Sequence, residues 1–291
     1  MKIAVFGKTF NDDASVHLKE LFIDLKNRNA SVFMYEPFEL LLARKKIDTY
    51  KSGIFSSYSD IPQVDYLLSL GGDGTFLESI VHIRDKNIPI LGINTGRLGF
   101  LATTPKQKIR EDIALLWDNK FQIEERTLLK AETQPDVFGD LNFGLNEFSI
   151  LKRDTSSMIV VHTFIDDVFL NSYWSDGVLI STPTGSTAYA LSCGGPVVMP
   201  TSNNFVISAV NPHNLNVRPL VVSDNSKITF QVEGRSKSFL ACLDSRSKTV
   251  SQESKITIRK EDFKIKIIKI ENYHFLKTLR EKLNWGLDQR N

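Results

Sequence analysis

The segment Gly71–Thr75 carries residue types that suit the handling of phosphate groups. Its sequence is Gly-Gly-Asp-Gly-Thr, and it stands between an apolar run and a helical pattern. Glycines permit positive φ angles and close approach of the backbone to a ligand, and the free N–H groups at a helix start attract phosphate oxygens. Asp73 repels phosphate, so it needs another purpose: to accept a proton from an attacking hydroxyl or to hold Mg²⁺. The segment indicates phosphoryl transfer. The alternative is an ordinary tight turn in which Asp73 or Thr75 caps the helix.

Two further segments offer neutral hydrogen-bonding groups. Residues 175–189 run from an apolar strand into the hydroxyl-rich stretch Ser-Thr-Pro-Thr-Gly-Ser-Thr-Ala-Tyr, which suits ribose and amide groups and ends in a ring, Tyr189, that can stack on a base or nicotinamide. In the sequence Leu-Asn-Glu-Phe, Asn146 can bind an adenine edge and Glu147 can accept from ribose hydroxyls. By composition alone, a solvated turn and an exposed surface pair remain open as alternatives.

The elements that must position these segments change in type along the chain. Apolar runs predict strands at 3–6, 31–35, 66–70 and 88–93, and helical spacing predicts helices at 18–25, 38–43 and 75–84. This alternation favours a parallel sheet with helices on its faces. From residue 121 onward, strand-like segments with period-2 alternation dominate, at 158–164, 228–232, 239–243, 256–258 and 263–270, and they favour a sandwich.

The predicted domains follow from that change. We expect an α/β domain over residues 1–120 and a β-sandwich domain over 121–272. Helical spacing returns in the tail, so we also expect a helix over 273–287 that packs back onto the first domain, with Gly286 as its C-cap.

Composition bounds the function classes. The chain has 291 residues, 42% hydrophobic and 24% charged, with a net charge of +2, which is ordinary for a globular protein and gives no support for binding to nucleic acid or a membrane surface. No apolar run approaches the roughly 18 residues of a membrane span. Cys193 and Cys242 are too few for a disulfide framework, so we expect reduced thiols in a cytoplasmic protein, and no Cys/His cluster suggests zinc.

Together, the three segments resemble the NAD kinase family. The stretches GGDGT with TFLES after it, ILGINTGRLGFLA, LNEF and SDGVLISTPTGSTAYALSCGGPVV stand in that family's order and at its usual separations, and PHNLNVRPLVV and HFLKTLREKLNWG also match. The resemblance covers about residues 66–222 and the tail. GGDGT alone is shared with diacylglycerol and sphingosine kinases, whereas the GSTAY segment together with the Asn-Glu pair is much more specific.

The resemblance implies a fold and an activity. The fold is a Rossmann-like α/β domain joined to an all-β sandwich, with a nucleotide cleft between them and a C-terminal helix that returns to the first domain. The activity is transfer of the terminal phosphoryl group of ATP, or a related donor, to the 2′-hydroxyl of the adenosine ribose of NAD, which gives NADP. A divalent cation, Mg²⁺, is expected to be needed. Relatives are usually homo-oligomers, so we expect a soluble cytoplasmic dimer or tetramer without nucleic-acid or membrane partners.

The resemblance also assigns residues. Asp73 is the expected general base, Gly74 lies against NAD, Asn146 and Glu147 bind the adenosine part, and Asp176 contacts NAD. The remaining expected NAD contacts come from a single segment: Thr184, Thr187, Ala188, Tyr189, Ala190, Leu191 and Ser192. No residue is assigned as a metal ligand.

Two departures concern phosphate charge. Trp174 and Glu78 stand where some relatives have basic residues, which leaves the neutralisation of phosphate to Arg97, Arg218 or metal ions. Two other functions fit parts of this pattern. A lipid kinase would share GGDGT but favour an apolar substrate groove. A non-catalytic NAD sensor would have no use for Asp73.

Overall fold

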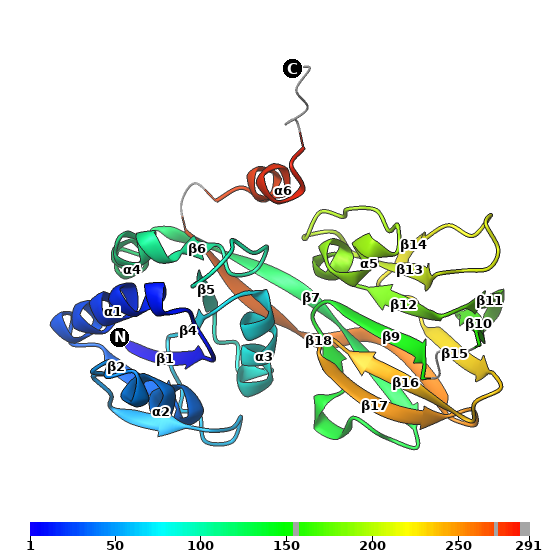
Figure 1. Ribbon diagram of the computed structural model, residues 1–291, viewed down its shortest axis with the longest axis horizontal. Coiled ribbons are helices and arrows are strands. Elements are labelled where there is room, and N and C mark those ends of the chain that lie inside the picture. Colours follow the sequence, from blue (N-terminus) through cyan, green and yellow to red (C-terminus); the bar gives the residue numbers. More distant parts are fainter. Residues whose placement is uncertain (154–156, 271–272, 286–291) are drawn as a thin grey trace. The chain divides into compact units, whose positions relative to one another are not determined.

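A computed structural model describes residues 1–153, 157–270 and 273–285 of the chain. The chain folds into two compact units, Met1–Glu125 with the described residues from Ile265 onward, and Arg126–Lys264. Both changes of unit fall inside strands, β7 (Phe121–Gln134) and β18 (Lys255–Ile270). Strand β18 therefore enters the first unit at Ile265, ahead of the limit at residue 272 that the sequence predicts (Figure 1).

The first unit is built on a parallel sheet. Its strand order is β18-β5-β4-β1-β2-β3, with the short β6 also on β5. The end of β18 joins beside β5 where Ile267 pairs with Ile90. The predicted strands are confirmed within two residues of their ends, as β1 (Lys2–Gly7), β2 (Ser31–Tyr35), β4 (Tyr66–Leu70) and β5 (Ile90–Asn94); the sequence analysis missed β3 (Gly53–Phe55) and β6 (Thr104–Pro105).

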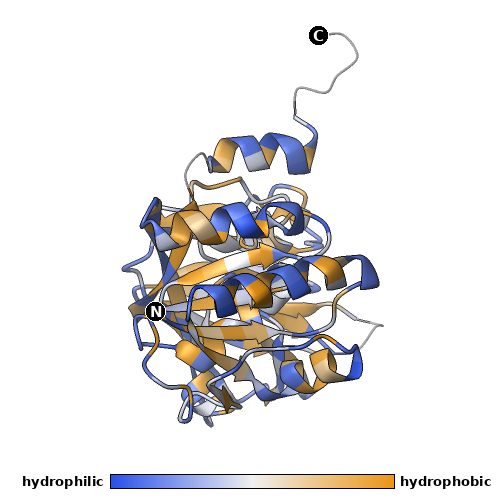
Figure 2. Ribbon diagram, turned by 90° about the vertical axis from the view of Figure 1, so that its left-hand side faces the viewer, coloured by the Kyte–Doolittle hydropathy of each residue, from blue (hydrophilic) through white to orange (hydrophobic). Residues whose placement is uncertain are grey.

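Helices cover this sheet. In α1 (Ser15–Asn27), the apolar residues at helical spacing, Leu18, Leu21, Phe22 and Leu25, are all buried. The others are α2 (Glu36–Arg44), α3 (Asp73–Ile83) and α4 (Ile109–Trp117), with short 3₁₀ turns at Asp12–Ala14 and Lys106–Lys108. Figure 2 shows hydrophobic strands behind helices whose turns alternate between hydrophilic and hydrophobic residues, as amphipathic helices on a buried sheet require. The Rossmann-like prediction is thus confirmed.

The second unit is a sandwich of two antiparallel sheets. One sheet has the order β11-β10-β15-β18 and the other β14-β13-β12-β9-β16-β17. Their inner faces share one core, in which the rings of Phe148 and Phe230 stack at 6.2 Å across the two sheets. The strands are β8 (Phe143–Gly144), which pairs with β7, β9 (Glu147–Lys152), β10 (Ile159–Ile165), β11 (Val168–Ser175), β12 (Gly177–Ser181), β13 (Asn204–Val210), β14 (Leu220–Ser223), β15 (Ile228–Glu233), β16 (Ser238–Leu243) and β17 (Arg246–Ser251).

The C-terminal helix α6 (Phe275–Leu283) packs on the first unit, as predicted. Leu279 is buried, the ring of Phe275 lies 6.0 Å from that of Phe100, and the ammonium group of Lys282 donates to the carbonyl of Leu98. The helix ends at Asn284, which has a left-handed φ of 55°, while Gly286 lies outside the described residues. Across the described ranges, no helix combines the length and apolar character needed to cross a bilayer.

Candidate functional site

The Gly-Gly-Asp-Gly-Thr segment connects β4 to α3 at the carboxyl end of the parallel sheet. Helix α3 begins at Asp73 with Gly72 as N-cap and without a side-chain cap, so the alternative in which Asp73 or Thr75 caps the helix is wrong. Positive φ angles are also absent here, because among the described glycines they occur only at Gly139 and Gly194. Instead, a Cβ at Gly71 would overlap the side chain of Thr75, whereas Cβ atoms at Gly72 and Gly74 would meet nothing within 4 Å. The segment therefore leaves open space beside the helix start.

The Asp73 side chain is held by the backbone of a second loop in the same unit. Its Oδ2 accepts the N–H of Phe100 at 2.8 Å, and its Oδ1 accepts those of Leu101 and Ala102, each at 3.0 Å. A Cβ at Gly99 would overlap this carboxylate, so the close approach requires glycine. Asp73 is half-buried, and the sequence analysis did not foresee these partners.

Asn94, at the end of β5, shapes that second loop. Its side-chain oxygen accepts the N–H of Gly96 at 2.7 Å, and its amide nitrogen donates to the carbonyls of Arg97 and Ala102. The two loops that follow β4 and β5 are thereby joined through Asp73 into one rigid edge. Arg97 at its tip is exposed.

Asn146 and Glu147 stand at the start of β9 in the second unit. Asn146 is only 8% exposed, and its carbonyl accepts the N–H of Thr182 at 2.9 Å. One oxygen of Glu147 accepts the backbone N–H of Tyr189, whereas its Oε2 is buried without a hydrogen-bond partner among the described residues. Burial, and after it the charge of Asp244, raises the pKa of Glu147 to about 8. The expectation of an exposed surface pair is therefore wrong.

The predicted segment after β12 forms a 3₁₀ turn, Thr184–Thr187, and the short helix α5 (Tyr189–Ser192). Its members differ in access to solvent. Tyr189 is 38% exposed and Ser192 is exposed, Thr187, Ala188 and Leu191 are partly exposed, and Thr184 and Ala190 are buried. The Thr184 hydroxyl accepts at 3.1 Å from Arg126, a buried residue that the sequence analysis missed.

Asp176 is ion-paired beside this segment. Its carboxylate lies 2.7 Å from the ammonium group of Lys152 and accepts from the Asn211 side chain at 3.1 Å. The hydrogen bonds from Lys152 and then Asn211 lower the pKa of Asp176. Burial raises the pKa of Tyr189, and Asp176 and Glu147 add to this effect. The second unit thus brings Glu147, Asp176 and Tyr189 into one electrostatic neighbourhood.

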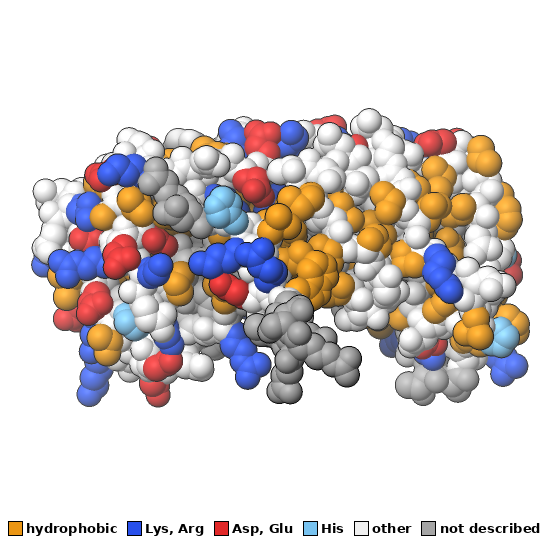
Figure 3. Space-filling view, turned by 90° about the horizontal axis from the view of Figure 1, so that it is seen from above, with side chains coloured by type: hydrophobic (Ala, Val, Ile, Leu, Met, Phe, Trp, Pro, Cys, Tyr) orange, Lys and Arg blue, Asp and Glu red, His pale blue; other side chains and the backbone are white. Residues whose placement is uncertain are grey.

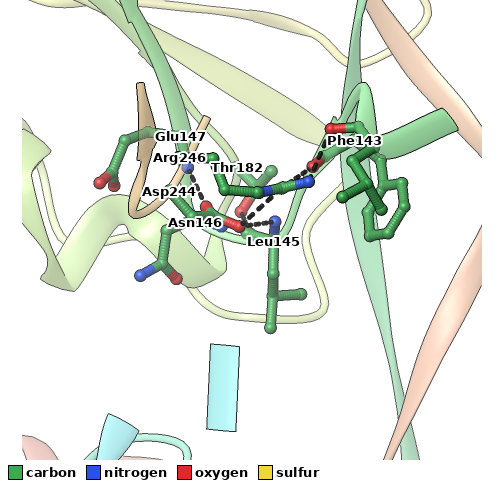
Figure 4. A network of polar contacts seen from close by, with 8 residues as sticks. Phe143, Leu145, Asn146, Glu147, Thr182, Asp244 and Arg246 are labelled. Carbon is green, nitrogen blue, oxygen red and sulfur yellow. Dashed lines mark hydrogen bonds and ion pairs between the residues drawn. The ribbon is translucent and has the colours of Figure 1, made fainter. Parts of the chain in front are cut away.

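Asp244, in the turn between β16 and β17, and Arg246, the first residue of β17, are functional candidates that the sequence analysis also missed. Asp244 accepts three consecutive backbone N–H groups, from Leu145, Asn146 and Glu147. Figure 4 shows this network, with the Asn146 amide and the Glu147 carboxyl both on the side away from Phe143. The sequence at this point reads Asp-Ser-Arg, which is typical of any hairpin turn, so it gave no sign of these contacts.

Of the expected sources of positive charge, Arg97 is exposed and Arg218 donates to the carbonyls of Leu215 and Val217. Glu78 is paired at 2.5 Å with Lys8, a residue just after β1 that the sequence analysis did not consider. Trp174 is 54% exposed, with its ring 4.9 Å from that of His213.

One cavity, of about 350 Å³, lies in the first unit between α4, α6 and the loop around Thr104. None of the predicted site residues lines it. Within the described ranges, no three His, Cys, Asp or Glu side chains are grouped so that they could hold a metal ion.

Comparison with known proteins gives concordant matches. Residues 26–121 match the family model of the ATP-NAD kinase N-terminal domain, and residues 145–270 match that of the ATP-NAD kinase C-terminal domain. The NAD kinases of Cytophaga hutchinsonii and Flavobacterium psychrophilum are 49% and 46% identical to this chain, each over 100% of both sequences.

Two solved structures share the fold. Yeast NADH kinase complexed with NADH has a TM-score of 0.86 at 21% identity and covers 99% of this chain and 89% of its own. An NAD kinase from Archaeoglobus fulgidus in complex with ATP has a TM-score of 0.74 at 26% identity, with coverage of 98% and 99%.

Proposed function

Because this chain belongs to the NAD kinase family of phosphotransferases, we propose that it moves the terminal phosphoryl group of ATP onto the 2′-hydroxyl of the adenosine ribose of NAD and so forms NADP. One observation carries the residue-level proposal. The Leu-Asn-Glu-Phe and Gly-Ser-Thr-Ala-Tyr segments, far apart in sequence, are in direct contact, because a Cβ at Gly185 would overlap the Asn146 carbonyl, and the nearby Thr182 N–H donates to that carbonyl at 2.9 Å. The two segments whose residue types suit adenosine binding therefore lie against each other in the fold.

The proposed NAD-binding residues lie in these two segments and next to them. We assign the adenosine part to Asn146 and Glu147, because a side-chain amide and a carboxyl together offer donors and acceptors for a base and for ribose hydroxyls. Asp176 and Gly74 complete the proposed contacts, together with the segment residues Thr187, Ala188, Tyr189, Leu191 and Ser192. Thr184 and Ala190 are buried, so their contribution is to support this segment.

Asp73 is the proposed general base. Its Oδ2 accepts one N–H, from Phe100, and so retains a lone pair for the proton of a ribose hydroxyl. The three N–H donors fix its orientation, and a positioned base contributes about 10²–10⁴-fold to rate. Positioning and charge neutralisation supply most of the remainder in phosphoryl transfer.

We further propose that a divalent cation, Mg²⁺ by expectation, arrives bound to the triphosphate, since the described side chains offer no metal-binding cluster. We expect the chain to work in the cytoplasm, where ATP and NAD are both available. The free thiols of Cys193 and Cys242 fit a reducing compartment.

A homo-oligomer, dimer or tetramer, is also proposed. Edge strands β11 and β14 carry large exposed apolar side chains, among them Phe169, Trp174 and Val221. In Figure 3, the face of the second unit seen from above carries many hydrophobic and few charged side chains, unlike that of the first unit. Exposed apolar surface and unpaired strand edges favour association.

The direct test is incubation of the purified chain with ATP, Mg²⁺ and NAD, followed by an NADP-specific dehydrogenase readout. We expect NADP to accumulate. A parallel assay with a lipid acceptor separates the lipid-kinase alternative, and absence of NADP together with lipid phosphorylation would refute the proposal. A sensor without catalysis would yield neither product.

A further inference from the structure

The turn between β16 and β17 hydrogen-bonds to Leu145 and Asn146, which precede β9, and to Glu147, which begins it. Asp244 has a left-handed φ of 51°. Oδ2 accepts the N–H of Leu145 at 2.9 Å, and Oδ1 accepts those of Asn146 at 2.8 Å and Glu147 at 3.2 Å. The Asp244 N–H donates in return to the Glu147 carbonyl at 3.0 Å. The Asp244 side chain is only 3% exposed, so these bonds exclude water.

Arg246 hydrogen-bonds to the backbone just before Leu145. Its guanidinium donates to the carbonyls of Leu141 and Phe143, lies over the Phe143 ring at 5.2 Å, and stands 3.8 Å from Asp244 Oδ2. Asp244 in the turn and Arg246 at the start of β17 thus hold residues 141–147 in place through hydrogen bonds from or to their charged side chains (Figure 4).

The loop after β12 also hydrogen-bonds to this backbone. The Thr182 N–H donates to the Asn146 carbonyl at 2.9 Å, and the Thr182 hydroxyl donates to the Leu145 carbonyl at 2.5 Å. A Cβ at Gly185 would overlap the Asn146 carbonyl, so the two backbones are in direct contact. With its N–H and carbonyl both engaged, Asn146 has only its side chain left to offer a ligand.

Strand pairing does not account for Asp244. The β9–β16 ladder has its register without it, from Leu243 opposite Phe148 onward. Burial of a carboxylate costs several kcal/mol before its partners offset it, and an apolar or neutral turn avoids that cost. The three bonds fall on the very residues that carry the proposed adenosine contacts, which is where fixed geometry has functional value.

We propose that Asp244 and Arg246 are positioning residues, which hold the Asn146–Glu147 backbone in the geometry that binds the nucleotide. The inference rests on the proposed assignment of Asn146 and Glu147 to the adenosine part of NAD. Its chemistry is indirect. Neither charged group needs to touch NAD, and both act through the peptide units of residues 141–147.

The test is Asp244→Asn in the full-length enzyme. An asparagine has one acceptor oxygen and an NH₂ group that opposes one of the three N–H donors, so the Asn146–Glu147 backbone shifts. We expect KM for NAD to rise about 10- to 100-fold while KM for ATP changes less than about twofold. Asp166→Asn is the matched control, because Asp166 also has a left-handed φ in a hairpin and accepts one backbone N–H, from Lys227, away from this site.

A pH readout separates positioning from general loss of stability. Burial raises the pKa of Asp244, whereas the three backbone N–H groups and Arg246 oppose that rise and favour the charged carboxylate. The charge of Asp244 in turn adds to burial in raising the pKa of Glu147. In Asp244→Asn, the midpoint of the pH dependence of KM for NAD should therefore move to lower pH, and in Glu147→Gln it should vanish. A loss of folded protein alone would leave that midpoint in place, and an unmoved midpoint would show that Asp244 does not act on Glu147.

Further variants keep the inference open to refutation. Arg246→Gln leaves Asp244 intact and should raise KM for NAD but not KM for ATP. This variant replaces Asp244→Asn as the test if Asp244→Asn does not fold. An unchanged KM for NAD in both variants, alongside a raised KM in Asn146→Ala, would overturn the positioning role alone. An unchanged KM in Asn146→Ala itself would instead remove the proposed adenosine contact on which this role depends.

Discussion

At the residue scale, the two carboxyl groups of the proposed site have opposite surroundings. Asp73 is half-buried and receives three backbone N–H groups, which suit a carboxylate. Glu147 receives one, its Oε2 is buried without a partner among the described residues, and its pKa is raised to about 8 by burial and by Asp244. Glu147 is thus arranged to be neutral at pH 7, whereas the oxygens of Asp73 are held by backbone donors. Such divergence is typical of sites that use two acids differently.

The first prediction concerns Asp73→Asn. Turnover should fall about 10²–10⁴-fold because the proton acceptor is lost, while the dissociation constant for NAD changes little. Single-turnover NADP formation and calorimetric NAD binding measure the two quantities. Asp65→Asn is the control, since Asp65 also accepts one backbone N–H, from Lys2, on the exposed surface. Turnover within about twofold of the original enzyme would remove Asp73 from the base role.

The second prediction concerns Glu147→Gln and stability. The folded pKa of Glu147, about 8, lies above its usual 4.5, so between these values the folded chain binds more protons than the unfolded chain. The stability from this group is complete below pH 4.5 and is lost as pH rises through 8. The melting temperature of Glu147→Gln, relative to the original chain, should therefore rise between pH 5 and pH 8.5. A difference in melting temperature that is flat across thermal scans in this range would contradict the assignment.

At the scale of elements, the loop after β5 and the start of α3 act as one piece. Gly99→Ala should displace the Asp73 carboxylate, which three N–H bonds hold in place, and should cost about 1–3 kcal/mol of unfolding free energy together with turnover. In Gly96→Ala, the new Cβ would meet only Asn94 Oδ1, at 4.0 Å, so its stability should be close to that of the original. Urea titrations and NADP assays on both variants check this. Equal effects of the two substitutions would show that the Gly99 contact is dispensable.

The packing of α6 gives an independent prediction. Leu279 is buried against the first unit, whereas Leu276, one helical turn earlier, is 54% exposed. Leu279→Ala should lower the free energy of unfolding by about 2 kcal/mol or more, because it removes buried methyl groups. Leu276→Ala should change it by less than about 0.5 kcal/mol. If chemical denaturation gave similar losses for both, the helix would not pack through Leu279.

Strong periodicity made most of the first unit predictable. Leu18, Leu21, Phe22 and Leu25 repeat at helical spacing and are all buried. Helix α4 was missed even though Ile109, Ile113 and Leu116 share a buried face, because charged residues interrupt its short apolar pattern. Helix α3 starts two residues earlier than predicted because Asp73 itself adopts helical backbone, which no spacing rule reveals.

The proposed site was less predictable than the fold. Residue types identified Asp73, Asn146 and Glu147, but their partners come from loops distant in sequence. Asp244 follows Asn146 by 98 residues and meets it only because β9 and β16 pair. Hydrogen bonds to backbone N–H groups leave no signature in the contacted residues, since every residue except proline has one.

At the scale of the whole molecule, charge limits how phosphate can be handled. The net charge is +2, Lys8 is paired with Glu78, and the described chain holds no metal-binding cluster. We therefore expect turnover to be lost in excess chelator and restored by added Mg²⁺, while NAD binding persists. Coupled assays with and without chelator measure the first, and calorimetry measures the second. Full turnover in excess chelator would show that the protein's own cations suffice.

The change of unit within β18 has a consequence for synthesis. The sheet of the first unit gains its strand beside Ile90 only from residues after Ile265, whereas Arg126–Lys264 contains both sheets of the sandwich. On the ribosome, residues 126–264 therefore emerge while β5 has only β4 and the short β6 beside it and still lacks β18. The first unit, although its synthesis begins first, is therefore completed after the sandwich, because the β5 edge that β18 covers stays open until the residues after Ile265 have been made.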